Sequence, residues 1–367
     1  MYTLFRRYFL GGLLLLCVWL WAACSKSNSG NGAAVTRVDA TVQPLRFMLD
    51  NNSAFSNFDT LMKVSGYMDS LGKGRSYTLL VPDNTAFINA GIGIDSLLAL
   101  PKDSLRLFVG NHILPGVVTT DLVPQTITNP LTAVNGQTLY LSKPLISSYV
   151  YQYPDLLRQY QHTLHVNGIK VTLTDQKAVD GILHTLHFPL RLTVPSVARY
   201  LLSQPQYSLY VAGLRKFNLF DQLDSAGPFT IFPCPNDAMI AYGMTLDRIN
   251  SDTFDLEHYT PWLFTSGILD SRTFMSDFTD AQLPNNNTGY TRYGTMQYGY
   301  GDYGQADPIM SIQITNYTSP LGPNYSIYNN IGPTANSHLK DQQPALNGVI
   351  MPLDKILVYP DSVYITH

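Results

Sequence analysis

The chain has 367 residues, 45% of them apolar, which is enough to bury a sizeable core and favours two or three domains. Its formal net charge is −3 and only 13% of its residues are charged, so no basic surface is expected and nucleic acid is excluded as a partner. The 24 tyrosines and the plentiful glycine are typical of exported β-rich proteins.

The N-terminus has the layout of a secretory signal. Arg6 and Arg7 precede an apolar run from Phe9 to Trp21. This run is about 13 residues long, whereas a membrane-spanning helix needs about 20. We therefore expect residues 1–23 to be a signal peptide and not a transmembrane anchor.

The four residues that end this segment, "WAAC", resemble the lipobox of bacterial lipoproteins, with Trp21 in a place that is usually aliphatic. The resemblance implies lipidation of Cys24 and attachment to the outer membrane, facing either the periplasm or the cell surface. Cys17 is a poorer candidate because the bulky Leu16 precedes it. Cys234 is then the one thiol left, which excludes a disulfide framework.

Residues 24–38 are polar, small and without periodicity, and we predict a flexible tether there. The rest of the chain repeats itself. The segment Tyr77–Phe87, "YTLLVPDNTAF", recurs at Phe229–Met239, and Phe58–Leu71 aligns with Tyr210–Leu223 at the same offset of 152 residues. We predict two tandem domains, at residues 39–194 and 195–360.

Two further blocks extend the alignment. Leu107–Gly116 is matched with residues 258–267, at an offset of 151, and Asp180–Leu190 with Asn347–Leu357, at an offset of 167. The increase predicts an insertion of about 16 residues in the second repeat. It falls in a Tyr/Gly-rich stretch at about residues 283–335.

Each repeat shows the same order of predicted elements. A helix with apolar residues at three- and four-residue spacing (Phe55, Phe58, Met62; then Tyr207, Tyr210, Leu214) comes first. A strand, a polar turn and a Leu-rich helical stretch follow. Alternating strands such as "QTLYLS" and "GIKVTLTD" lead to a last apolar strand after Asp-Gly or Asn-Gly.

These blocks together resemble the fasciclin domain family. The residues that carry the resemblance in the first repeat are Thr78, Pro82, Asn84, Ala86, Phe87, His112, Pro115, Gly116, Gly181, Ile182, Leu183 and His184, with Asp180 in place of Asn. Those in the second are Thr230, Asn236, Asp237, Ala238, Gly267, Asn347, Gly348, Val349 and Ile350, with Leu263 aligned to the family's histidine.

The resemblance implies an α+β fold: two tandem domains, each a β-sandwich or wedge with helices packed along one edge. It implies extracellular roles in adhesion and surface contact, and it does not imply a catalytic mechanism. We expect no cofactor. Likeness of fold is weak evidence for function by itself.

The polar turn after the first strand has a structural interpretation. Pro82 ends the strand, and Asp83 or Asn84 caps the following helix, which places Phe87 (Met239 in the second repeat) in the core. A phosphate-binding turn would need glycines and a lysine, which this turn lacks.

Histidine gives the one metal-like pattern, "HTLH", at His162/His165 and again at His184/His187. Residues three apart in a strand point to opposite faces, so neither pair can chelate an ion alone, although one histidine from each could meet across a hairpin. We favour histidines bonded inside the fold, and no metal, over a zinc site.

No nucleophile arrangement is apparent. There is no G-x-S-x-G, and Cys234 lies between two prolines in a predicted buried turn. Asp252, Asp255 and Glu257 are interpreted as first-turn residues of a predicted helix, where carboxylates suit the dipole. A hydrolase is therefore disfavoured.

The Tyr/Gly-rich insertion is the feature that the repeat does not require. Tyrosine offers rigid contact area with a polar tip, and glycine lets the backbone bend around it, as in binding loops. The candidate contacts are Tyr290, Tyr293, Tyr298, Tyr300 and Tyr303. The alternative is a twisted hairpin whose tyrosines cover the second domain.

The sequence thus predicts an envelope protein, held to the membrane through lipid on Cys24, that binds a protein or polysaccharide by adhesion or interaction. The alternative function is a glycan-binding accessory of a polysaccharide uptake system.

Overall fold

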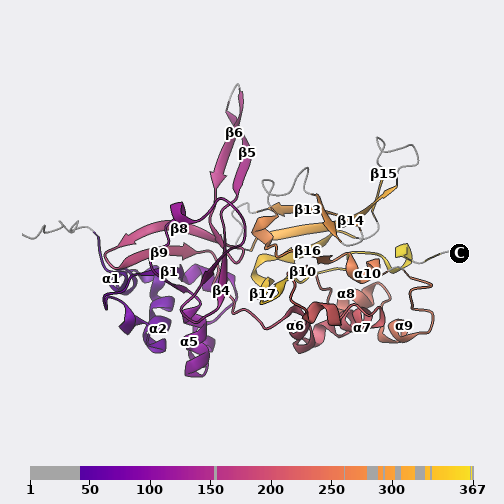
Figure 1. Cartoon of the computed structure of the whole chain (residues 1–367), viewed down its shortest axis with the longest axis horizontal. Coiled ribbons are helices and arrows are strands. Elements are labelled where there is room, and N and C mark those ends of the chain that lie inside the picture. The colour runs from indigo at the N-terminus through magenta and orange to yellow at the C-terminus, as the bar shows by residue number, and fades with distance from the viewer. Residues whose placement is uncertain are drawn as a thin grey trace, which may run out of the picture. The chain divides into compact units, whose positions relative to one another are not determined.

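The computed structural model describes residues 42–152, 155–259, 261–278, 288–291, 294–301, 307–318, 327–330, 333–363 and 365. Each repeat mixes helices with a sheet, and in each the helices gather on one side of the strands (Figure 1). The predicted α+β class is confirmed. No helix within these ranges has the length and hydropathy needed to span a bilayer.

The helices of the first repeat form where the apolar spacing predicted them. In α2, Ser56–Ser65, the buried side chains are Phe58, Leu61, Met62 and the small Ser65, at helical spacing along one face. The other helices are α1 (Leu45–Asp50), α3 (Asn84–Asn89), α4 (Ile94–Leu98) and α5 (Lys102–Gly110).

The first strand of the repeat pairs with its last. β1, Tyr77–Pro82, lies parallel to β9, Gly181–Leu186, and antiparallel to β2, Ile113–Pro115. Leu79 and Val81 of β1 face a core formed with the helices, whereas Leu80 joins a second core on the other face. Because both faces are covered, β1 is a continuous apolar run, as expected for a buried parallel strand.

The remaining strands of this repeat continue the sheet in the order β2-β1-β9-β8-β7-β4-β3. Strand β8, Ile169–Ala178, pairs with β7 at its first two residues and with β9 from Val171 onward. Two register shifts interrupt the pairing with β9, so β8 is bulged where it joins the two parts of the sheet. The other strands are β3 (Asn129–Thr132), β4 (Thr138–Ser142), β7 (His165–Val166) and the separate hairpin of β5 (Leu145–Gln152) and β6 (Asp155–His162).

The second repeat follows the same plan. β10, Phe229–Ile231, is parallel to β18, Gly348–Ile350, and antiparallel to β11, Ile268–Leu269. β17, Gln343–Ala345, completes this sheet. The helices are α6 (Val197–Ser203), α7 (Ser208–Lys216), α8 (Asn236–Ala241), α9 (Leu246–Asn250) and α10 (Trp262–Thr265).

A second sheet of this repeat contains the Tyr/Gly-rich insertion. Its strand order is β12-β13-β14-β15, and β16 pairs with the other part of β14. The bounds are β12 (Thr288–Thr291), β13 (Gly294–Gly301), β14 (Ile309–Thr318), β15 (Ile327–Asn330) and β16 (Ala335–His338).

The link between the repeats is short and bonded. The Val194 N–H donates to the Pro344 carbonyl, and the Leu346 N–H donates to the Val194 carbonyl. Ser196 then caps α6 by accepting the Arg199 N–H. The new helix begins at Val197, two residues after the predicted boundary.

Strand pairing corrects the predicted register of one block. Thr78 lies opposite Leu114 in the first repeat, and Thr230 lies opposite Leu269 in the second, so these segments are 155 residues apart and not 151. The counterpart of His112 is therefore Gly267, since both carbonyls accept the equivalent strand N–H, and Leu263 corresponds to Phe108. The predicted register was wrong because it matched Gly267 with Gly116 on residue type alone.

A second correction concerns the acidic cluster. Asp252, Asp255 and Glu257 lie in turns between α9 and α10, and not in the first turn of a helix. The Asp255 carboxylate accepts the backbone N–H groups of Glu257 and His258 and binds the His258 ring at 2.7 Å, so it closes a turn.

One packing exchange distinguishes the two repeats. Leu61 and Val109 are both buried in the first repeat. Their counterparts are Gly213 and Phe264, and a Cβ on Gly213 would lie 1.9 Å from the Phe264 ring. The larger side chain of the pair is Leu61 of α2 in the first repeat and Phe264 of α10 in the second. The smaller residue has moved to the opposite helix, so the core stays filled.

We expect Gly213→Ala to destabilise the second repeat by about 1–3 kcal/mol, because the new methyl overlaps the Phe264 ring. At an exposed helical site the same change would stabilise by up to about 1 kcal/mol, so the sign is diagnostic. Urea unfolding measures it. Gly213→Leu/Phe264→Val, which copies the first repeat, should recover most of the loss seen with Gly213→Leu. Additive effects of the two changes would contradict this account.

Candidate functional site

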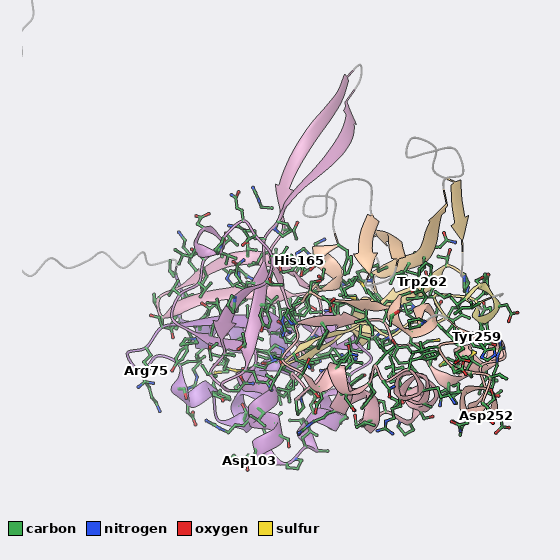
Figure 2. All side chains as sticks on the ribbon, turned by 45° about the vertical axis from the view of Figure 1, so that its right-hand side comes forward. Arg75, Asp103, His165, Asp252, Tyr259 and Trp262 are labelled. Atoms are coloured by element: carbon green, nitrogen blue, oxygen red, sulfur yellow. The ribbon has the colours of Figure 1, made fainter. Side chains whose placement is uncertain are left out.

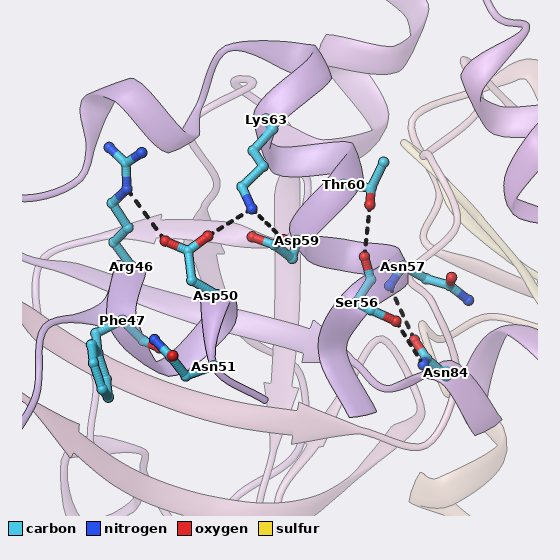
Figure 3. Close-up of polar contacts among 10 residues, drawn as sticks. All are labelled: Arg46, Phe47, Asp50, Asn51, Ser56, Asn57, Asp59, Thr60, Lys63 and Asn84. Atoms are coloured by element: carbon cyan, nitrogen blue, oxygen red, sulfur yellow. Dashed lines mark hydrogen bonds and ion pairs between the residues drawn. The ribbon is translucent and has the colours of Figure 1, made fainter. Parts of the chain in front are cut away.

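The polar turn after the first strand connects elements of the fold. Asp83 caps α3 by accepting the Ala86 N–H at 2.8 Å. Asn84 points instead toward the start of α2: its Oδ1 accepts the Asn57 N–H, and its Nδ2 donates to Ser56 Oγ (Figure 3). The same Nδ2 also donates to the Ser53 carbonyl. Both ends of the amide are therefore bonded within the fold.

The same connection recurs in the second repeat. The Asn236 Oδ1 accepts the Leu209 N–H at 2.9 Å, and its Nδ2 donates to the Pro205 carbonyl and Ser208 Oγ. An amide fits this place because it accepts and donates at once. The turn is a joint between the strand and the first long helix in both repeats.

The strand threonines fasten the segment that follows β2 or β11. Thr78 is fully buried; its hydroxyl donates to the Gly116 carbonyl and accepts the Val118 N–H. Thr230 does the same with Ser271 and Thr273. Pro82, the last residue of β1, pairs with Leu186 of β9.

His112 is buried with both ring nitrogens bonded. The Leu190 N–H donates to Nε2 at 2.9 Å, so Nδ1 must carry the proton that it donates to the Phe108 carbonyl at 3.0 Å. This arrangement holds the ring neutral, and burial lowers its pKa to about 4.

His184 has the opposite tautomer. Its Nδ1 accepts the Asp175 N–H, so Nε2 donates to the Val118 carbonyl at 2.8 Å. Burial lowers the pKa of this imidazole too. Of the other histidines in the pattern, His162 ends β6, His165 starts β7 and His187 packs its ring edge-on against Phe188.

The described part of the chain contains no group of three or more His, Cys, Asp or Glu side chains placed to hold a metal ion. Cys234 is free and 5% exposed, and burial raises the pKa of its thiol, which opposes formation of the nucleophilic thiolate.

Two glycines allow the first and last strands of each repeat to meet. A Cβ on Gly181 would lie 2.0 Å from the Tyr77 carbonyl oxygen, and one on Gly348 would lie 2.4 Å from that of Phe229. Asn347 precedes the second of these. It accepts the Val197 N–H and donates to the carbonyls of Leu223 and Ser225. In the first repeat Asp180 accepts the Leu45 N–H.

The predicted tyrosine contacts are only partly described. Tyr293 and Tyr303 lie outside the described residues. Tyr290 lies in β12 opposite Thr295, and Tyr298 and Tyr300 lie in β13, opposite Ile312 and Met310, which are fully buried. Cys24 also lies outside the described residues. Ligand binding by the tyrosines stays a prediction.

An open pocket of about 550 Å³ lies in the first repeat, lined by residues of the segment 67–77, by residues 113–116 and by Val134. Leu71 and Ile113, which are buried, and Tyr67, Tyr77 and Val134, which are half-buried, line it with apolar surface. Arg75 stands at its rim, on the loop before β1, and Figure 2 shows this side chain at the periphery of the molecule.

The features that the two repeats share do not indicate this pocket. The usable signal was a difference between them: Tyr67, Arg75 and Tyr77 correspond to Leu219, Gly227 and Phe229 in the second repeat.

Each repeat is thus an α+β unit whose shared polar residues bond to backbone groups and to neighbouring hydroxyls of the same repeat. The model of the fasciclin domain family matches residues 53–190, so this part of the chain is similar to fasciclin domains. The strand pairing gives the second repeat the same plan.

Human periostin is similar to this chain, with 23% identity over 164 residues, which are 44% of this chain and 18% of periostin. The chain thus spans less than a fifth of that relative. A fasciclin domain pair from the insect cell adhesion molecule fasciclin I has 17% identity, covering 85% of this chain and 99% of that chain, with a TM-score of 0.35.

We expect Thr78→Val to lower the free energy of unfolding by about 1–3 kcal/mol, because it leaves the Val118 N–H and Gly116 carbonyl without their partner in a buried place. Thr60→Val, which removes an exposed bond to the Ser56 carbonyl, is the control and should cost less than about 1 kcal/mol. Equal losses in urea unfolding would show that the buried hydroxyl has no special role.

His112 should make stability depend on pH. Its folded pKa of about 4 lies below the unfolded value of 6.5, so its contribution is complete above pH 6.5 and is lost as the pH falls toward 4. Wild type should therefore lose about 1.4 kcal/mol per pH unit more than His112→Gln in this window. Unfolding free energies that fall in parallel for the two proteins would refute the assignment.

Proposed function

We propose that the protein is an exported lipoprotein, anchored through lipid on Cys24, that binds a protein or glycan at the cell envelope through its fasciclin-like repeats. The observation that carries the proposal is the family match at residues 53–190, because domains of this family are associated with cell adhesion and interaction. The signal-like N-terminus and the small polar segment at residues 24–38 support export and tethering.

The proposal includes that the protein is not an enzyme. His112 and His184 have neutral rings with both nitrogens bonded to the backbone. Cys234 is buried, and burial raises the pKa of its thiol, which therefore stays protonated. Groups used in this way are poorly suited to acid–base or nucleophilic work.

Cys24→Ser tests the anchor. In the producing cell we expect this variant to leave the membrane fraction and to lose label from radioactive fatty acid, whereas Cys17→Ser, which changes the other thiol of the N-terminal segment, should stay membrane-bound. A Cys24→Ser protein that remains labelled and membrane-bound would refute the proposal.

A second candidate is a glycan-binding accessory of a polysaccharide uptake system, favoured by the alternation of tyrosine and glycine between residues 290 and 304. A glycan array on the mature protein separates the two functions. The accessory function predicts binding that is lost when Tyr293, Tyr298 and Tyr300 are changed to Ala and kept in Tyr359→Ala. Binding that survives the triple change, or no binding to any polysaccharide, would exclude it.

A further inference from the structure

We propose that the pocket in the first repeat binds a small amphipathic organic anion, with its apolar body against Ile113, Leu71 and the tyrosines and its anionic group at Arg75. This inference is independent of the envelope-binding function, which concerns macromolecules. The volume of about 550 Å³ falls in the range of small-molecule sites.

The interior of the pocket favours an apolar body. Ile113 is 2% exposed and Leu71 9%, and both line the cavity with aliphatic carbon. Tyr67 and Tyr77 add ring surface at the sides. The Arg106 guanidinium covers one face of the Tyr67 ring, 4.4 Å from its centroid, and also donates to the Ser65 carbonyl, which holds that ring in place.

The charges around the mouth favour an anion. Arg75 lines the rim, Lys73 lies two residues before it on the same loop, and Arg106 lies behind Tyr67. Asp69 and Asp180 are the acids on neighbouring segments, and the Asp180 carboxylate is already bonded to the Leu45 N–H. A guanidinium at the edge of an apolar cavity suits a carboxylate or sulfonate.

The second repeat shows why the pocket belongs to the first. Asn347 donates to the carbonyls of Leu223 and Ser225 and so holds that loop down. Asp180 is the counterpart of Asn347, and a side chain without an amide N–H cannot make the same bonds to the carbonyls of the corresponding loop, residues 71–75.

The residues that line the pocket in the first repeat are also more exposed than their counterparts in the second. Leu219 and Phe229, the counterparts of Tyr67 and Tyr77, are 9% and 5% exposed, whereas the two tyrosines are half-buried. The second repeat also lacks the cation, because Gly227 corresponds to Arg75. In the first repeat, therefore, the amide that holds the loop is replaced by the carboxylate of Asp180, which leaves the pocket open. Arg75 adds a positive charge to this pocket, and the two tyrosines add ring surface.

Titration calorimetry on the mature protein tests the proposal with three probes that share one ten-carbon chain: decanoate, decanol and decylamine. We expect decanoate to bind with one site per chain and more tightly than the other two. Arg75→Ala should lower the affinity for decanoate by about fivefold and leave the affinity for decanol unchanged. Lys73→Ala, which removes the same charge from the same loop without lining the pocket, should change decanoate binding by less than about twofold.

Val134→Trp should abolish binding of decanoate by filling the cavity, with circular dichroism as the check that the variant is folded. The proposal is overturned if decanoate does not bind below its aggregation concentration, if decanol or decylamine binds as tightly, or if a folded Val134→Trp protein binds normally. These outcomes leave the Cys24 anchor and the glycan array result unaffected, so the two proposals fail separately.

Discussion

The fold of each repeat depends on pairing its first strand with its last. β1 joins β9 and β10 joins β18, and in both cases the whole intervening chain must be closed into a loop before the pair can form. Parallel strands covered on both faces need every polar group nearby to be satisfied internally. Gly181 and Gly348 remove the side chain where the backbones approach most closely, and Thr78 and Thr230 bind the chain that runs beside the pair.

This constraint separates scaffold from surface in the molecule. Asn84, His112, His184 and Asn236 look like candidates for chemistry in the sequence, yet each has its polar atoms bonded to backbone or a neighbouring hydroxyl. A group used in this way stabilises the fold and offers little to a partner. Recognition is therefore sought where the two repeats differ: at the first-repeat pocket, in the tyrosine-rich insertion and at the N-terminal cysteine.

The sequence predicted the parts of the fold that depend on local signals. The helical spacing of apolar residues predicted α2 and α7, and the Pro-Asp-Asn turn predicted where β1 ends and α3 begins. The sequence alignment paired Gly267 with the wrong residue of the first repeat, and it put the acidic cluster in a helix. The reason is that the turns at residues 251–261 differ in length from those of the first repeat, and neither a single glycine nor three carboxylates indicate the length of a loop. The pocket could not be predicted, since its shape depends on how the loop at 71–75 lies against β2, a contact between segments about 40 residues apart.

Native-state hydrogen exchange on the mature protein tests the primacy of the first–last strand pair most directly. We expect the amides of Leu79, Leu80 and Val81 in β1, of Ile182 and Leu183 in β9, and of the matching strands β10 and β18 to exchange last, at rates that report global unfolding. The amides of the separate hairpin β5–β6 should exchange earlier. Exchange of the β1 and β9 amides as fast as those of the hairpin would show that the fold does not depend on this pairing.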